Sequence, residues 1–331
     1  MDATRLETPK TLQAAIEFFS DPDRCHAYVV QTRWPDGVVT CPICNQPNPR
    51  YLATQRRFEC RTKHARRQFS VKVGTIFEDS PIALKSWLLA VWMISNCKNG
   101  ISSYELHRAL GVTQKTAWFM LHRVRLAMQD RNAGGGQLGG EVEVDETYIG
   151  GKARNMHKRK RDAIGMKRGR QADGTVAGKI AVMGLLERHT GGKASRIRTT
   201  VVPNVRKHLL HAEIAKHVED GSTVYTDALM SYRNLAVYYQ HKVIDHAEKY
   251  VDGQIHTNGC ENYWSLLKRA IRGTYVSVEP FHLFRYLDEQ AFRFNERTGT
   301  DGDRFTQTLS HVTGRRVMYK DLIGKPQEQS A

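Results

Sequence analysis

The order of strand-like and helical segments after residue 140 constrains the fold of this 331-residue chain most strongly. Residues 141–145 alternate acidic residues with valine, the period-two pattern of a strand with one polar and one apolar face. The later segments are, in order, apolar stretches at 179–186 and 195–202, a helical pattern at 204–218, a strand at 223–226, an expected helix, an apolar stretch near 236–244 and two helices. This order predicts an α/β domain in which helices cover a mixed sheet.

Three acidic residues fall where such a sheet would bring them together. Asp145 shares the polar face of its strand with Glu141 and Glu143. Asp227 ends a later strand, and strand ends are common places for reactive groups. Glu261 follows near the start of an expected helix. This arrangement matches an RNase H-like layout, in which a mixed sheet flanked by helices gathers three acids at one edge.

The helix that carries Glu261 also carries a useful cation. Thr257 or Asn258 could cap a helix that runs to about residue 271, because a short side-chain oxygen can accept a bond from an unpaired backbone N–H. Seven residues are nearly two helical turns, so Glu261 and Lys268 share one face. That face could offer a metal ligand and a cation for a DNA phosphate, while Trp264 turns toward the core.

These acids are the residue types that divalent-metal chemistry needs. Carboxylates from separate segments can hold two magnesium or manganese ions about 3.5–4 Å apart, a spacing suited to phosphoryl transfer. Taken singly, Asp227 is more simply a turn residue or a helix cap, and Glu261 and Lys268 are ordinary helix-surface charges. The combination with Asp145 in a strongly basic chain favours the catalytic interpretation.

The charge balance indicates the partner. Fifty Lys and Arg residues against 34 Asp and Glu residues give a net charge of +16, which favours a polyanion such as nucleic acid. The polar amino terminus lacks the apolar stretch of a secretory signal, and the apolar run at 87–94 is too short to span a bilayer. We therefore expect no membrane partner and a cytoplasmic protein that associates with the nucleoid through DNA.

Four metal-binding side chains have the spacing of a structural zinc site. Cys41 and Cys44 form one CxxC pair, and Cys60 and His64 form a second pair after fifteen intervening residues. Three thiolates and an imidazole close a tetrahedral zinc site and leave no place for a substrate. Because the second pair is CxxxH where a ribbon normally has CxxC, His64 could instead be a surface residue.

A helix-turn-helix pattern follows at 101–128. The turn is expected at Gly111, and Thr113 can cap the second helix. The start of that helix carries the residues that a recognition helix would present to a major groove, namely Gln114, Lys115 and Thr116. The alternative is a helical hairpin that only packs.

The remaining basic residues suggest further contacts with the DNA backbone. The run at 152–170 contains nine Lys or Arg residues just after the first acidic strand. Such a run is usually a solvated loop, but its position favours phosphate contacts. The candidates are Lys158, Arg159, Lys160 and Arg161, with Arg269 beside Lys268.

Glycine-rich sequence marks the clearest domain boundary. The predicted domains are an N-terminal segment with the zinc ribbon (1–78), the helix-turn-helix module (79–133), a Gly-rich linker (134–140), the catalytic domain (141–297) and a polar C-terminal tail (298–331).

Several longer motifs resemble one family. They are RWPDGVVTCPIC, QFSVKVGTIFEDSPIALKSW, VDETYIGGK, YTDALMSY, and HTNGCENYWSLLKRAIRGTY followed by FHLFRYLDEQAFRFNER. Together they cover most of residues 25–297, and they resemble bacterial insertion-sequence transposases of the DDE class, with the ISXO-type group most similar. That group has a zinc ribbon before an RNase H-like catalytic domain.

The resemblance implies a role for each matching residue. Asp145, Asp227 and Glu261 would be the acidic triad, and Lys268 would contact DNA near the cleavage point. Cys41, Cys44, Cys60 and His64 would bind zinc. Some relatives have Asn as the third catalytic ligand, so Asn258 could share metal binding.

The expected activity is therefore that of a magnesium-dependent DNA transposase. It would cut at the ends of an insertion sequence and transfer the strands into target DNA by two-metal phosphoryl transfer. The expected partners are terminal inverted repeats, target DNA and further copies of the chain in a dimer or higher assembly. Two alternatives are a non-enzymatic, zinc-dependent DNA-binding regulator and a nuclease without strand transfer.

Overall fold

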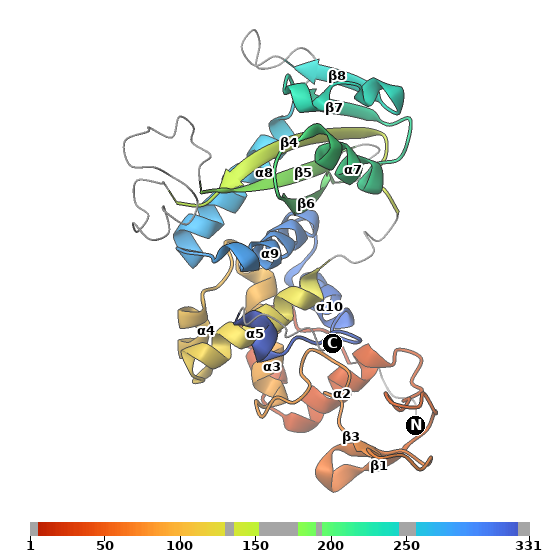
Figure 1. Cartoon of the computed structure of the whole chain (residues 1–331). Coiled ribbons are helices and arrows are strands. Elements are labelled where there is room, and N and C mark those ends of the chain that lie inside the picture. The colour runs from red at the N-terminus through yellow and green to blue at the C-terminus, as the bar shows by residue number, and fades with distance from the viewer. Residues whose placement is uncertain (1–5, 130–135, 152–177, 190–193, 245–255, 324–331) are drawn as a thin grey trace, which may run out of the picture. The chain divides into compact units, whose positions relative to one another are not determined.

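The computed structural model describes residues 6–129, 136–151, 178–189, 194–244 and 256–323. The chain divides into two compact units, one formed by 1–129 with 296–331 and the other by 130–295 (Figure 1). The linker glycines Gly134 and Gly135 and the basic candidates at 158–161 lie outside the described residues.

The described part of the second unit contains a five-stranded mixed sheet in the order β6-β5-β4-β7-β8. Strand β5 is antiparallel to both β4 and β6, whereas β7 is parallel to both β4 and β8. The strands are β4 (Glu141–Ile149), β5 (Ile180–Glu187), β6 (Arg196–Val202), β7 (Thr223–Asp227) and β8 (Gln240–Ile244). The predicted α/β class and RNase H-like layout are confirmed.

Helices cover both faces of this sheet, as Figure 1 shows for α7, α8 and α9. Helix α7 (Lys207–His217) packs on the face that carries Val142 and Val144. Helices α8 (Asn258–Ala270) and α9 (Leu283–Asn295) cover the opposite face. The period-two pattern of β4 thus places its valines in one core and turns Glu143 and Asp145 toward α8.

The connection between β7 and β8 differs from the expected helix. It contains two 3-10 turns, at Met230–Tyr232 and Leu235–Val237. Asn234 lies between them with φ 74°, in the left-handed region that a continuous α-helix cannot include. A further irregular segment, the π-helix Ile271–Tyr275, extends α8, and a 3-10 turn at Pro280–His282 precedes α9.

The first unit combines helices with a small three-stranded sheet among its described residues. Its helices before residue 129 are α1 (Leu12–Phe18), α2 (Pro22–Arg33), α3 (Leu84–Asn96), α4 (Ser103–Leu110) and α5 (Gln114–Met128). The antiparallel strands are β1 (Arg50–Leu52), β2 (Arg57–Glu59) and β3 (Gln68–Phe69), with a 3-10 turn at Ala53–Gln55. The α4 and α5 pair has the predicted turn, because Gly111 ends α4 with φ 66° and Thr113 caps α5.

The segment after residue 297 is not a polar tail in its described part. It forms α10 (Asp301–Ser310) and α11 (Tyr319–Leu322) and belongs to the first unit. Phe305 is fully buried, with its ring centroid 5.1 Å from that of Trp92 on α3. Thr300 and Asp303 form a capping box at the start of α10, so a local helix signal was present in the sequence.

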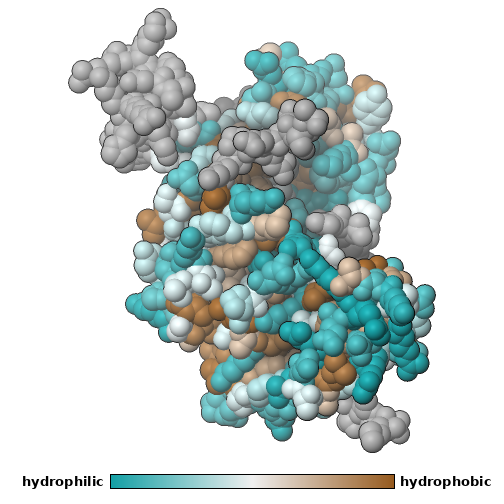
Figure 2. All heavy atoms as spheres, turned by 60° about the horizontal axis from the view of Figure 1, so that its bottom comes forward, coloured by the Kyte–Doolittle hydropathy of each residue, from teal (hydrophilic) through white to brown (hydrophobic). Residues whose placement is uncertain are grey.

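The surface is mainly hydrophilic on the face that Figure 2 shows, with small groups of hydrophobic residues between hydrophilic ones. No helix in the described ranges has both the length and the apolar character needed to cross a membrane.

Candidate active site and metal centre

The four predicted zinc ligands, Cys41, Cys44, Cys60 and His64, lie close together in the first unit. Cys41 Sγ is 3.5 Å from His64 Nε2, and Cys44 Sγ is 3.5 Å from Cys60 Sγ. All four ligand atoms lie within 4.8 Å of one another. Tetrahedral zinc bonds of about 2.0–2.3 Å require ligand separations of roughly 3.5–3.8 Å, which these distances match. His64 therefore belongs to a Cys3His cluster whose geometry fits a structural zinc ion.

Local structure explains this preorganisation. The first pair sits in a tight turn, in which the Asn45 N–H donates to the Cys41 carbonyl and Asn45 adopts φ 57°. Burial opposes ionisation of the Cys60 thiol, but hydrogen bonds to His64, the Thr62 backbone and the neighbouring cysteines outweigh it and lower its pKa to about 6. A thiolate is the form that binds zinc.

Asp145 has a fixed orientation on β4. The Trp264 indole Nε1–H donates to Oδ2 at 2.9 Å, and the Glu146 backbone N–H donates to Oδ1 at 2.8 Å. Gly184 is the β5 partner of Asp145 and permits this arrangement. A Cβ there would lie 2.6 Å from the Trp264 ring. The sequence predicts only a core position for Trp264, and the glycine inside the β5 strand is the signal of this close approach.

Asp227 lies beside Asp145 across the parallel pair of β4 and β7. The last residues paired in the register are Glu143 and Tyr225, and Asp145 and Asp227 each lie two residues beyond that pair, on the same face of the sheet. The negative charge of Asp227 contributes to the raised pKa of Asp145, which places the two acids near each other. The Asp227 Oδ1 accepts the N–H of Leu229 at 3.1 Å, which fixes the carboxylate where the strand ends. The sheet topology therefore brings the first two acids together.

Glu261 reaches the same region from the first turn of α8. The pKa of Asp145 is raised to about 6. Burial is the main cause, and the negative charges of Asp227 and Glu261 act in the same direction, while the hydrogen bonds from Trp264 and the Glu146 N–H oppose the shift. A buried carboxylate with two further carboxylates close enough to raise its pKa is a chemical fit for divalent cations.

The spacing of these three carboxylates differs from that of the zinc ligands. Among the described residues, the zinc group is the one set of three or more potential ligands whose atoms all lie within 4.8 Å of one another. The acidic group is more open. Two ions about 3.5–4 Å apart, each with ligands about 2.1 Å away, can span carboxylates up to roughly 8 Å apart.

Lys268 lies close enough to influence the same site. Burial and the positive charges of Arg272 and Lys179 lower its pKa, while the negative charge of Asp145 opposes the shift. Arg269, the next residue, is exposed.

Glu146 is a further acidic residue of this region, in addition to the predicted triad. It projects from the other face of β4, where it accepts a hydrogen bond from the Tyr232 hydroxyl. Its pKa is raised to about 8. Burial is the main cause, the charges of Asp227 and Asp145 act in the same direction, and the hydrogen bond from Tyr232 opposes the shift. Glu146 occupies a position of β4 where the alternating pattern calls for an apolar residue, which is the sequence signal for the buried Glu146–Tyr232 pair.

The start of α8 is capped in an unexpected way. Thr257 is the N-cap residue, but its side chain makes no capping bond. Instead, Glu143 on β4 accepts the Cys260 backbone N–H at 3.0 Å. Glu143, which we had placed on the same polar face as Asp145, is only 1% exposed.

The candidate DNA residues of α5 lie in its first turn, and each makes a contact within the first unit. Gln114 donates to the Ser103 hydroxyl at 2.8 Å, and the Thr116 and Thr113 hydroxyls are 2.9 Å apart. The Lys115 Nζ lies 4.5 Å from the centre of the Tyr319 ring. Lys115 remains exposed, whereas the later part of α5 is largely buried.

Comparison with known proteins gives matches over both units. Residues 137–295 match the ISXO2-like transposase domain, and residues 20–62 match the transposase zinc-ribbon domain. The second match ends two residues before His64. His64 joins the three cysteines because its ring nitrogen lies within 4.8 Å of their sulfur atoms. The chain is also 31% identical over 263 residues to an uncharacterized protein in transposable element ISH50 of Halobacterium salinarum, a match that covers 77% of this chain and 84% of that protein.

Proposed function

This chain belongs to the ISXO2-like transposases, and we propose that it cuts the ends of an insertion sequence and transfers the freed strands into target DNA. Its transposase and zinc-ribbon domains imply DNA binding. The observation that carries the catalytic proposal is the charge interaction of Asp145 with both Asp227 and Glu261, which come from two other elements.

The three carboxylates would hold magnesium or manganese. When bound, such ions polarise a phosphate oxygen and lower the pKa of an attacking hydroxyl or water. Asp145 supplies a ligand whose direction is set by Trp264, and Asp227 supplies a second ligand from the neighbouring strand. Glu261 completes the set from α8, and exposed Asn258 lies one helical turn before it, where it could assist.

The surrounding cations would position the DNA. Lys268 lies near Asp145 on the Glu261 helix, where it can contact a phosphate beside the reacting bond. Arg269, Lys115 and the basic run at 158–161 would neutralise more distant phosphates. Cutting two ends suggests that at least two copies act together.

The test compares Asp145→Asn with Asp220→Asn on DNA that carries the element ends. Asp145→Asn should abolish cleavage in magnesium and leave DNA binding nearly unchanged, because it removes a ligand used in the chemical step. Asp220 is an exposed acid of the same unit, so its variant should cleave normally. Cleavage by Asp145→Asn at the wild-type rate would eliminate the assignment.

Product analysis separates the two alternative functions. A regulator would bind the ends without metal-dependent nicking. A nuclease would cut them without producing joined molecules. We expect joined products when a target plasmid is added, because the same site can use a freed 3′-hydroxyl as the attacking group.

A further inference from the structure

We infer that Glu143 is a positioning residue that holds the start of α8, and with it Glu261, at the acidic site. The inference rests on the proposed function, because it concerns the placement of a proposed metal ligand. It assigns to Glu143 a role that differs from metal binding, although Glu143 lies two residues before Asp145 on the same face of β4.

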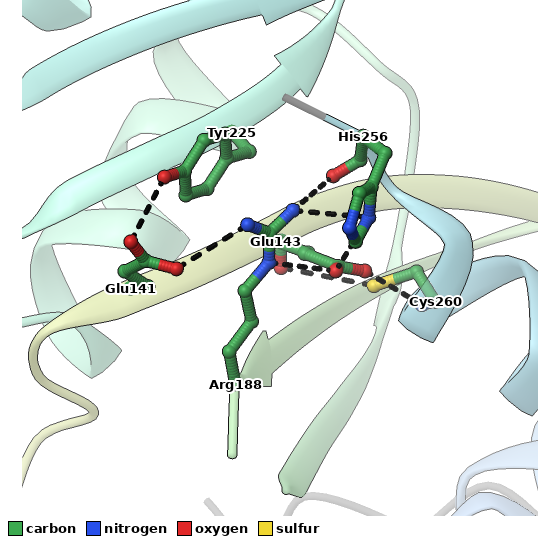
Figure 3. A network of polar contacts seen from close by, with 6 residues as sticks. All are labelled: Glu141, Glu143, Arg188, Tyr225, His256 and Cys260. Atoms are coloured by element: carbon green, nitrogen blue, oxygen red, sulfur yellow. Dashed lines mark hydrogen bonds and ion pairs between the residues drawn. The ribbon is translucent and has the colours of Figure 1, made fainter. Parts of the chain in front are cut away.

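Both carboxylate oxygens of Glu143 already have donors, as Figure 3 shows. Oε1 accepts the Arg188 Nε–H at 2.9 Å and lies 3.3 Å from His256 Nδ1. Oε2 accepts the Cys260 N–H at 3.0 Å. A metal ion would have to displace the Arg188 guanidinium from a buried carboxylate, which favours a structural use of this charge.

Arg188 is itself held in place by several groups. Its guanidinium lies 3.9 Å from the centre of the Tyr225 ring and 3.3 Å from Glu141 Oε2. Its Nη2 donates to the His256 carbonyl at 2.6 Å. The Tyr225 hydroxyl in turn donates to Glu141. This network connects residues of β4 and β7 and the end of β5 to His256, which lies just before the N-cap residue of α8 (Figure 3).

Glu143 performs the task that an N-cap side chain normally performs. The Cys260 amide is one of the first N–H groups of α8, which have no partner inside the helix. A carboxylate at this end also interacts favourably with the helix dipole. Because the Thr257 side chain makes no capping bond, the acceptor comes from β4 instead.

The geometry leaves little room for another arrangement. A Cβ on Gly259 would lie 2.8 Å from Glu143 Oε2 and 2.9 Å from a methyl group of Leu186. Glycine at this helical position therefore allows the carboxylate to approach the backbone. The Cys260 thiol also lies 3.7 Å from the Glu143 carbonyl, so the strand and the helix start meet at two points.

A second contact follows one turn along α8. Cys260 meets Glu143, and Trp264 meets Asp145. Four residues of a helix advance about 6 Å and two residues of a strand about 6.7 Å. The spacing of the two contacts along α8 therefore nearly equals their spacing along β4. Glu261 lies between Cys260 and Trp264 on α8, so the two contacts together set its position relative to the sheet.

The decisive experiment compares two double variants of the full-length, zinc-loaded protein. Glu143→Leu with Arg188→Met removes the buried charges and the acceptor for Cys260. Glu143→Gln with Arg188→Met removes the same charges but keeps an oxygen that can accept the Cys260 N–H. The two proteins therefore differ mainly in the cap that we assign to Glu143.

The readouts are manganese affinity without DNA, and amide hydrogen exchange over residues 257–264. We expect the leucine variant to bind manganese roughly tenfold more weakly, or worse, and to exchange faster, a size typical of lost support behind a metal ligand. The glutamine variant should remain within a few-fold of wild type. Equal manganese affinities and equal exchange in the two variants would overturn the inference.

A further pair of variants covers the case in which the leucine protein does not fold. Gly259→Ala must push the Glu143 carboxylate or the helix start aside, whereas a Cβ on Gly273 would meet no atom within 4 Å. We expect weaker manganese binding for Gly259→Ala only, and unchanged binding would count against the role of Glu143. If wild type shows no manganese binding that Asp145→Asn removes, the proposed function itself fails.

Discussion

The zinc group of the first unit and the acidic group of the second unit are assembled in opposite ways. The zinc ligands come from two turns within 24 residues, and their atoms already lie within 4.8 Å of one another. The acids come from two strands and a helix separated by up to 116 positions, and they remain more widely spaced. Local turns therefore preassemble one site, whereas the sheet and α8 must assemble the other.

This difference explains what surrounds each group. The zinc thiolates need few supporting contacts, because the ion itself joins the turns. The carboxylates repel one another, and buried interactions must hold them in place. Trp264 orients Asp145, while the Arg188 and Glu143 pair secures the start of the helix that carries Glu261.

Removal of zinc should produce the largest effect and the clearest contrast. A structural zinc ion contributes on the order of 10 kcal/mol or more to the folding of a small module. We expect Cys60→Ser to unfold the ribbon, detected as rapid proteolysis within residues 41–64, while the second unit stays protected.

Cys97→Ser is the matched control, because Cys97 lies outside the zinc group. Persistence of an ordered ribbon in zinc-free Cys60→Ser protein would show that the two metal groups do not differ in the proposed way.

The acidic group should instead weaken the metal-free protein as the pH rises. The folded pKa of Asp145, about 6, is above its ordinary value of 3.8, so protonated Asp145 favours the folded state. Its contribution is fully present below pH 3.8 and is lost as the pH rises through about 6. The shift corresponds to roughly 3 kcal/mol.

Urea unfolding of zinc-loaded, magnesium-free protein from pH 4 to pH 7.5 checks this expectation. Asp145→Asn should lose less stability than wild type over that range, and Asp220→Asn should follow wild type. Parallel profiles for wild type and Asp145→Asn would mean that burial and the neighbouring charges do not raise the pKa of Asp145 in the folded chain.

Gly184→Ala should have a smaller effect that is confined to the acidic region. The new Cβ would lie 2.6 Å from the Trp264 ring, so the indole must move away from Asp145. Such overpacking typically costs about 1–3 kcal/mol. We expect a lower unfolding temperature and weaker manganese binding, with zinc content unchanged.

Gly273→Ala again provides the control, because its Cβ would meet no atom within 4 Å. Wild-type manganese affinity in Gly184→Ala would indicate that the Trp264 contact does not support the site.

Most of the structure that could be predicted from the sequence came from patterns within short segments. The alternation at 141–145 located β4, and the spacing of the cysteines and His64 located the zinc group. The acidic positions could be selected because the order of the strands makes β4 and β7, which carry Asp145 and Asp227, neighbours in the sheet. These features depend on residues close in sequence or on general rules of sheet topology.

The supporting contacts could not be derived in the same way. Trp264 and Asp145 are 119 positions apart, and Glu143 and Cys260 are 117 apart, so no local periodicity pairs them. Alternation assigns Glu143 to a face of β4 but does not reveal that Arg188 neutralises it. The α10 helix is different, because its capping box at Thr300 and Asp303 was a readable local signal.

Electron paramagnetic resonance of manganese bound to the full-length, zinc-loaded protein would test the acidic metal site most directly. We predict two magnetically coupled ions about 3.5–4 Å apart, the separation of a two-metal phosphoryl-transfer site. The coupled signal should vanish in Asp145→Asn. Isolated ions only, or a coupled pair that persists in Asp145→Asn, would contradict the proposal that Asp145, Asp227 and Glu261 form one metal site.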